Sequence, residues 1–536
     1  MRTVNTIQDS KGSDGNVTHG GTVIAPRNRK GGAGNPPPTD SLAIDLPDNR
    51  HQRFMERIRG PLLALSFLIS VALAGSVAFG AQAQVDCDTP DDLCVGDPCV
   101  IGAALVDASC VLDFGARTVV VAGRLRIPSD GEISLSAGAI QITGSVENLR
   151  PLAPASGGPK ISLIADGDIA LDGRILLAGG QDGVLLPGEV TLDAGGSLAV
   201  EGRLNATTSP TTILYRATGG DLVFSGRVKT SRDGGEITLS ASGSVELRGS
   251  LRRLEYIIVE AGTSAELRGS ATPRSSLTVD AGGVVTLDTS LRPLGADLVL
   301  HGEAGVVLQK SVYLTSLFVF AGSAEIVSAN GPVTISKPLR SVEVTVSAAG
   351  DIAVDAVVSA APPARSGGTI ALLSTGGDVI VSERLQAQSG DGTQPGDGAG
   401  GHIQIVAADL VSIAADIQVN AFPGRAGAPG GTLQIDAGRV LATGVRFDAD
   451  GDAPGPDFPG SPAAGFRLTS TSGEVSLDGS FMARGGPSVI EVAAATDLVA
   501  AGSFQVAPDG CIGLSAGGTV DTSAASFDTP VVVDCP

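Results

Sequence analysis

The sequence has few of the residues on which many enzymes depend. It is 536 residues long, yet it contains no tryptophan, three tyrosines and an aromatic fraction of 3%. Polysaccharide-cleaving enzymes combine clustered carboxylates with aromatic side chains that stack on sugar rings, so this composition disfavours them. Beyond residue 83 the only histidines are His301 and His402, and no Gly-x-Ser-x-Gly elbow with triad partners stands out. These shortages favour a protein that is not an enzyme.

Positive charge is also scarce. The formal net charge is -21, and the acidic excess lies beyond residue 83, because residues 1–60 are net basic and residues 61–83 carry no charge. A polyanion repels nucleic acid, so nucleic acid is excluded as a partner. We expect an acidic, solvated surface.

The uncharged stretch has the plan of an export signal. An apolar run over residues 61–79 follows two arginines and ends in small residues at Ala83. This pattern predicts a signal peptide at 55–83, general secretory export and a secreted or cell-surface protein. Residues 1–54 then form a disordered extension or precede the true start. The alternative is an uncleaved membrane anchor, because the run is about long enough to span a bilayer.

No cysteine lies between Cys110 and Cys511. All six cysteines follow the predicted signal, and they are Cys87, Cys94, Cys99, Cys110, Cys511 and Cys535. An even number after an export signal predicts disulfides, formed in an oxidising compartment. Four near the start and two near the end would staple both ends of an elongated body, with Cys511 joined to Cys535. The connectivity of the first four is open, and metal binding is their alternative.

Few segments look helical; short runs of alternating apolar residues repeat instead. Six columns of apolar or small residues recur about every 20 positions, and the first contains Ile237, Ile257, Leu277, Leu298 and Leu317. A period near 20 is typical of a coil of a parallel β-helix, in which alternate side chains point inward. We predict an all-β, single-stranded, right-handed parallel β-helix over 113–510. A Cys-rich cap at 84–112 and a C-terminal coil and cap at 511–536 complete it. A string of antiparallel sandwich domains is the alternative.

The repeated phrase G-x-[IL]-x-[LV]-x-A-x-G-x-[VI]-x-[LV]-x-G covers most of residues 111–520. It resembles secreted bacterial β-helix proteins of the filamentous-haemagglutinin and adhesin type. The resemblance implies a role in adhesion or matrix formation. The partners it implies are polysaccharide, cell-surface or matrix components, or copies of the protein itself. Membrane contact is expected only through the export signal or an anchor. The alternative is a polysaccharide lyase or glycoside hydrolase, which should show three or more outward charged residues on adjacent coils within one groove.

One basic cluster runs against the acidic field. The arginines of consecutive coils in this cluster are Arg248, Arg252, Arg253, Arg268 and Arg274. Arg248 and Arg268 occupy matching positions, and a glutamate lies two residues before each, so diagonal ion pairs should offset the stacking of like charges. The cluster is either a self-compensated surface stripe or a contact patch for an anionic polysaccharide.

The phrase "DADGDAPGPD" is the main candidate for calcium binding. Its alternate aspartates, which are able to converge on calcium, are Asp448, Asp450, Asp452 and Asp457. The twelfth position of an EF-hand count is Pro459 rather than glutamate, so that motif fails. An acidic solvated loop is the alternative, and we expect no other cofactor.

Overall fold

The structure of the chain is a computed structural model. It describes residues 83–532 and Cys535, apart from 86–89, 107–108, 129–130, 149–157, 179–186, 209, 232–233, 293–294, 315–321, 362–366, 390–398, 422–429, 452–463 and 485–487. The predicted extension and all of the predicted signal except Ala83 lie outside these residues. In the part of the chain that the structure describes, no helix is long and apolar enough to cross a membrane.

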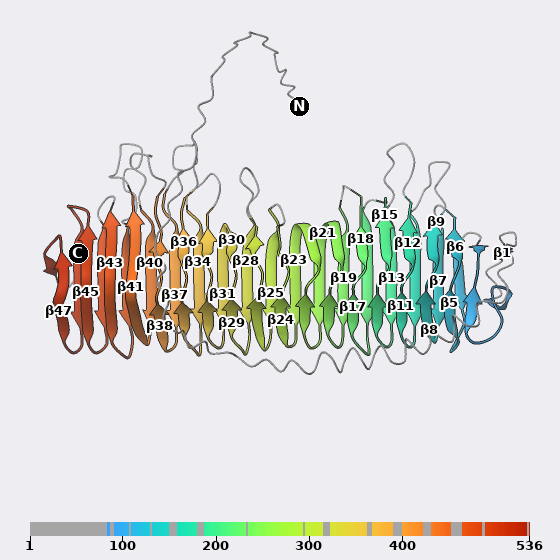
Figure 1. Cartoon of the computed structure of the whole chain (residues 1–536), viewed down its shortest axis with the longest axis horizontal. Coiled ribbons are helices and arrows are strands. Elements are labelled where there is room, and N and C mark those ends of the chain that lie inside the picture. The colour runs from blue at the N-terminus through green and yellow to red at the C-terminus, as the bar shows by residue number, and fades with distance from the viewer. Residues whose placement is uncertain are drawn as a thin grey trace, which may run out of the picture. The chain divides into compact units, whose positions relative to one another are not determined.

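One coil consists of three short strands. In a representative coil these are β19 (Glu236–Ala241), β20 (Val245–Leu247) and the first part of β21 (Ser250–Ala261). Each pairs in parallel with its counterpart one coil later, as in Ile237 with Ile257 and Val245 with Ala265. We call the three resulting ladders face 1 (with β19), face 2 (with β20) and face 3 (with the start of β21). The chain is therefore a parallel β-helix (Figure 1).

The alternation predicted from the sequence places apolar side chains inside the helix. Leu239 and Leu247 are completely buried, as is Leu267 one coil later, whereas Arg248 next to Leu247 is exposed. Roughly 18 coils stacked about 4.8 Å apart give a rod on the order of 85 Å long. Each coil contacts only its neighbours. The inward residues stack from coil to coil and form one continuous buried core along the rod.

One part of the predicted phase is wrong. The first column continues as expected from Ile237 to Leu298, but Leu298 then pairs with Ala324 rather than with Leu317. This step is 26 residues, as also seen in the Ser323–Asp297 hydrogen bond between the same coils. Extra residues follow Leu314 before the next face begins, and Leu317 lies outside the described residues.

Glycine forms the corner between faces 2 and 3. A Cβ atom added at any glycine of this column after the first would lie only 1.9–2.3 Å from the carbonyl oxygen of the glycine one coil earlier. The stacked column consists of Gly102, Gly123, Gly144, Gly173, Gly202, Gly226, Gly249 and Gly269. Such contacts leave no room for a side chain, so from Gly102 to Gly269 the corner is a bare seam of backbone.

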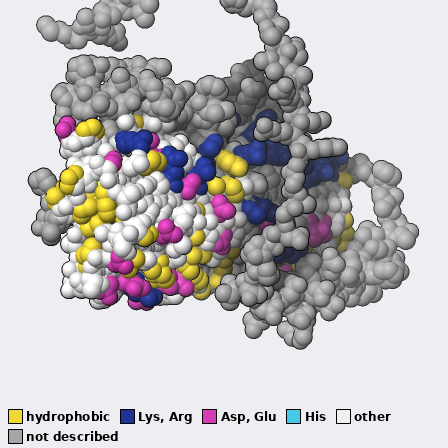
Figure 2. Space-filling model, turned by 60° about the vertical axis from the view of Figure 1, so that its left-hand side comes forward, with side chains coloured by type: hydrophobic (Ala, Val, Ile, Leu, Met, Phe, Trp, Pro, Cys, Tyr) yellow, Lys and Arg dark blue, Asp and Glu magenta, His cyan; other side chains and the backbone are white. Residues whose placement is uncertain are grey.

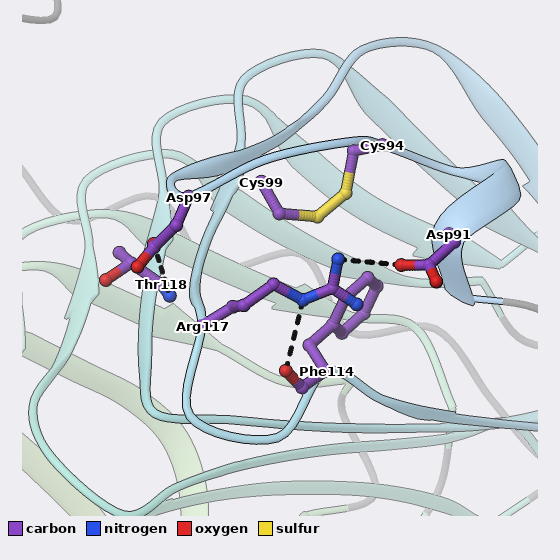
Figure 3. The surroundings of a disulfide bond; sticks show 7 residues. All are labelled: Asp91, Cys94, Asp97, Cys99, Phe114, Arg117 and Thr118. Carbon is purple, nitrogen blue, oxygen red and sulfur yellow. Dashed lines mark hydrogen bonds and ion pairs between the residues drawn. A yellow bond between two sulfur atoms is a disulfide. The ribbon is translucent and has the colours of Figure 1, made fainter.

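The N-terminal end is closed by a short covering segment. The helix η1 (Pro90–Asp92) is followed by Leu93, which packs on the core, and by a disulfide between Cys94 and Cys99. Asp91 forms an ion pair of 2.7 Å with Arg117, whose guanidinium lies over Phe114 (Figure 3). The first coil therefore already has a sealed core.

The first coil lies within the segment predicted as a cap. Its strands are β2 (Cys99–Ile101), β3 (Ala104–Val106) and β4 (Cys110–Asp113). Cys99 and Cys110 point into the core. Cys110 is also disulfide-bonded, and Cys87 lies outside the described residues.

The C-terminal disulfide is the predicted one. Cys511 and Cys535 are joined with an S–S distance of 2.08 Å. They connect β46 (Cys511–Ala516) to the segment after β48 (Val531–Val532) and so staple the last coil to itself. Next to it, a column of phenylalanines stacks along face 3 and contains Phe447, Phe481, Phe504 and Phe527.

Candidate anion-binding groove

A groove follows the glycine seam over several consecutive coils. Its floor includes Gly226, Gly249 and Gly269, and its volume is about 610 Å³. Because these glycines carry no side chains, the walls stand above the backbone. The charged residues of the walls are Glu201, Arg203, Arg227, Arg248 and Arg268. Four guanidinium groups and one carboxylate therefore line the same depression.

The face 3 wall is built by arginines that directly follow seam glycines. Arg203 opens β15 (Arg203–Ala206), and Arg227 opens β18 (Arg227–Lys229). The two pair directly across neighbouring coils, and Arg174 occupies the same position one coil before Arg203. All three are exposed. Like charges stacked in this way are destabilising by about 0.2–1 kcal/mol for each pair, and a bound anion relieves that repulsion.

Arg203 and Arg227 differ from the other wall in their partners. Among the described residues neither forms an ion pair. Across the seam, Arg248 pairs with Glu246, and Arg268 lies 2.5 Å from Glu266. The arginines of the opposite wall are thus paired with glutamates, whereas Arg203 and Arg227 have no ion-pair partner among the described residues, although Glu201 lines the same groove.

The predicted diagonal ion pair is present. Arg268 Nη1 lies 4.0 Å from Glu246 Oε1, one coil away, while Glu246 and Glu266 stand side by side on face 2. The expectation that Arg248 and Arg268 are neighbours on one outer surface is confirmed. Their contacts are local and solvent-exposed, so each pair adds little to stability.

The remaining predicted arginines extend the basic surface across face 3. Arg252 pairs with Lys229 of the preceding coil, and its Nε donates to Ser250 Oγ at 3.0 Å. Arg253 adopts a φ of 63° where the strand turns toward face 1. Arg274 is exposed on β23 (Ser270–Ala281), one coil further. The structure therefore brings the five predicted arginines onto adjacent coils.

Charge is unevenly distributed between the faces of the rod, although the basic residues Lys160, Arg216 and Arg467 also lie on face 1. The outward strand positions of face 3 include Arg174, Arg203, Arg227, Lys229, Arg252 and Arg340. Those of face 1 include Glu189, Asp193, Glu236, Glu260, Asp280, Asp297 and Glu343. Figure 2 shows Lys and Arg gathered mainly in the upper part of the view and Asp and Glu mainly below. An acidic protein thus carries a basic stripe on part of face 3.

The predicted calcium ligands are only partly described. Asp448 and Asp450 lie on β41 (Arg439–Asp450), whereas Asp452 and Asp457 fall outside the described residues. Asp448 is 3% exposed and its Oδ2 lies 2.7 Å from Arg446. The Oδ1 atoms of both aspartates are buried without a hydrogen-bond partner.

The two aspartates influence each other. Burial, together with the neighbouring charge of Asp448, raises the pKa of Asp450, although Arg484 and Arg446 oppose the shift. No group of three or more His, Cys, Asp or Glu residues that could hold a metal occurs within the described residues. Two carboxylates on one strand suit a hard cation, but Arg446 already occupies one oxygen. Calcium binding remains a prediction.

The two histidines beyond residue 83 and Asp193 each form a contact with a residue of a neighbouring coil. The ring nitrogen Nδ1 of His301 lies 3.2 Å from Asp280, and that of His402 lies 2.7 Å from Thr432. Asp193 is paired with Arg216. These groups are spread along the rod and do not converge.

No family model, curated protein or solved structure matches this chain. The resemblance to secreted adhesin-type proteins therefore remains a prediction, whereas the parallel β-helix is seen directly. The same holds for export and for the cell surface as its location.

Proposed function

We propose that this protein is a secreted or surface-exposed contact protein that binds an anionic polysaccharide along face 3. The observation that carries the proposal is the pair Arg203 and Arg227, stacked on adjacent coils beside a glycine floor and without ion pairs among the described residues. The proposed role is adhesion to envelope or matrix polymers rather than catalysis.

The repeat suits a polymer that lies along the rod. Successive coils are about 4.8 Å apart, so the stacked positions of Arg174, Arg203 and Arg227 offer one guanidinium per coil. A guanidinium fits carboxylate and sulfate groups in a bidentate manner. An extended chain with an acidic group on each sugar would meet one arginine after another. The open seam leaves room for such a chain because no side chain blocks it.

The expected affinity depends on repetition. An exposed ion pair contributes about 0.2–1 kcal/mol, so a single acidic sugar binds weakly. A polymer that spans several coils adds these contributions, because after the first contact the next acidic groups are already held close to their arginines. Its binding weakens as salt screens the charges. Such binding suits an adhesive surface, because many weak ion pairs together hold the polymer firmly while each single pair forms and breaks quickly.

The disulfides support export. The two that the structure describes in full staple the first and last coils, where a solenoid lacks one neighbour. Disulfides persist in oxidising compartments outside the cytosol. They therefore agree with the predicted signal peptide at 55–83.

The test is to measure binding to an immobilised polyuronate and to a sulfated polysaccharide at several salt concentrations. The variant Arg203→Gln/Arg227→Gln should bind about tenfold more weakly, which corresponds to about 1.4 kcal/mol and lies within the range of two exposed ion pairs. The matched control Lys160→Gln/Arg216→Gln removes two positive charges from face 1 and should stay within about twofold of the wild type. Equal losses in both variants would mean that net charge alone drives binding. Absence of binding to either polymer would reject the proposal.

A polysaccharide lyase is the second candidate. The groove does hold the cluster of outward charged residues on adjacent coils that such an enzyme requires, with Glu201 facing several arginines. In this reading the arginines would neutralise a uronate carboxylate and Glu201 would accept a proton. Incubation with polyuronate should then release unsaturated products that absorb in the ultraviolet, and Glu201→Gln should abolish them.

A further inference from the structure

The two ends of the rod are finished differently. At the N-terminal end the inward residues Cys99, Ile101 and Leu112 are at most 1% exposed. At the C-terminal end the corresponding apolar positions are open, since Val520 is 45% exposed and Val531 is 40% exposed. Both lie over buried core residues of the preceding coil, Val520 over Leu498 and Val531 over Ile512.

The last coil also presents strand edges. β47 (Val520–Phe527) pairs with β45 (Leu498–Val506), and β48 pairs with β46. Among the described strands neither has a neighbour on its other side. Such an edge carries unpaired N–H and C=O groups and is a template for another strand. The disulfide between Cys511 and Cys535 holds this coil in place.

We propose that the C-terminal end of the rod binds the same end of a second copy of this chain, with β47 pairing antiparallel to β47 of that copy around a two-fold axis.

The difference between the ends selects this arrangement. Head-to-tail stacking would need an open N-terminal core, but at that end η1 and Leu93 cover the core and β1 (Ala83–Val85) pairs on the outer side of β3. The open surface that a second copy offers is therefore its own C-terminal end, and the contact is isologous. A two-fold axis perpendicular to the rod reverses strand direction, which makes the pairing antiparallel.

The sequence of β47 is self-complementary in one register. When Val520 faces Phe527 of the second copy, two apolar residues meet across the axis. The same register places Asp521 opposite Ser526, so the carboxylate meets a hydroxyl rather than another carboxylate. The axis then passes beside Ala524, between the irregularity of β47 that precedes Ala524 and the bend at Ala525, so face 2 of one copy continues into face 3 of the other.

The contact also continues the aromatic column. Phe504 and Phe527 stack with ring centroids 5.2 Å apart, and Phe527 is only half-buried on its outer side. In the dimer Val520 of the second copy covers that side. The exposed Val531 and Val532 of β48 meet their own counterparts on face 1, where the two-fold axis maps the face onto itself.

A charge swap tests this register in the full chain. Sedimentation should find a species of twice the chain mass, and small-angle scattering should show a particle about twice as long as one rod. Ser526→Asp should weaken the dimer at least tenfold, because the new carboxylate faces Asp521 of the second copy. Adding Asp521→Lys to that variant should restore dimerisation. The matched control Ser503→Asp, at the equivalent position one coil earlier, should leave it unchanged.

Each other outcome overturns the proposal. A monomer at all concentrations means that the end has another occupant, whether an N-terminal segment of this chain or a different protein. A dimer of unchanged length means side-by-side contact. A dimer that tolerates Ser526→Asp, or that Asp521→Lys fails to rescue, uses another surface. None of these outcomes bears on polysaccharide binding, which is tested on face 3.

Discussion

The glycine seam makes a sharp prediction about stability. In Gly226→Ala the new Cβ atom would stand 2.1 Å from the carbonyl oxygen of Gly202. Ordinary contact begins near 3.4 Å, so the two coils must separate by about 1.3 Å at this corner, roughly a quarter of the coil spacing. The obstacle is backbone on a neighbouring coil, and no flexible side chain is available to move aside.

The cost follows from the geometry. Overpacking of this kind lowers the free energy of unfolding by about 1–3 kcal/mol. Replacing glycine by alanine also reduces the entropy of the unfolded chain, but this raises the free energy of unfolding by only about 0.4–1 kcal/mol. Gly102 is a matched control, because it begins the same column and an added Cβ there meets nothing within 4 Å. Gly102→Ala should therefore be neutral or slightly stabilising, opposite in sign to Gly226→Ala.

Hydrogen exchange is the suitable assay, because a solenoid need not unfold in one step. Amides of β17 (Leu222–Phe224) and β18 should exchange about tenfold to a hundredfold faster in Gly226→Ala, while the end coils stay unchanged. The thermal midpoint should fall as well. Equal protection in the two variants, or damage from Gly102→Ala, would refute the close-approach argument.

Two further predictions concern the carboxylate pair and the export signal. Because burial and Asp448 raise the pKa of Asp450, its charged form disfavours folding, and stability is lost as pH rises through the raised value. Asp450→Asn should therefore raise the unfolding midpoint at pH 7, and the gain should vanish below the ordinary pKa of 3.8; a gain independent of pH would contradict this. Mass spectrometry of the exported protein should find its N-terminus near Gln84, and an intact Met1 would reject cleavage.

Much of the fold was readable because its columns repeat in phase. From Ile237 to Leu308 the inward positions recur with nearly constant spacing, and the strand pairs follow them. The predicted pairing failed after Leu298, which pairs with Ala324. An insertion within that coil lengthens the spacing, while the residues on either side of it are of the same type as in the other coils. Spacing alone does not reveal how many residues a loop absorbs.

The groove was only half visible in the sequence. Arg248 and Arg268 stood out because their coils share a strict period. Arg203 and Arg227 belong to longer coils, so their common position became clear only from the strand register. The available signal was the recurring Gly-Arg dipeptide, in which the glycine forms the seam and the arginine its wall. The burial of Asp448 depends on packing between distant segments and had no local signal.

The most direct test of the proposed function is to map which arginines a bound polymer protects. An arginine-directed reagent would label the protein with and without saturating polyuronate, and mass spectrometry would quantify each site. Arg203 and Arg227 should lose most of their labelling, whereas Arg467 on face 1, 2.9 Å from Glu491, should keep it. Unchanged labelling of Arg203 and Arg227 while the polymer is bound would contradict binding along face 3.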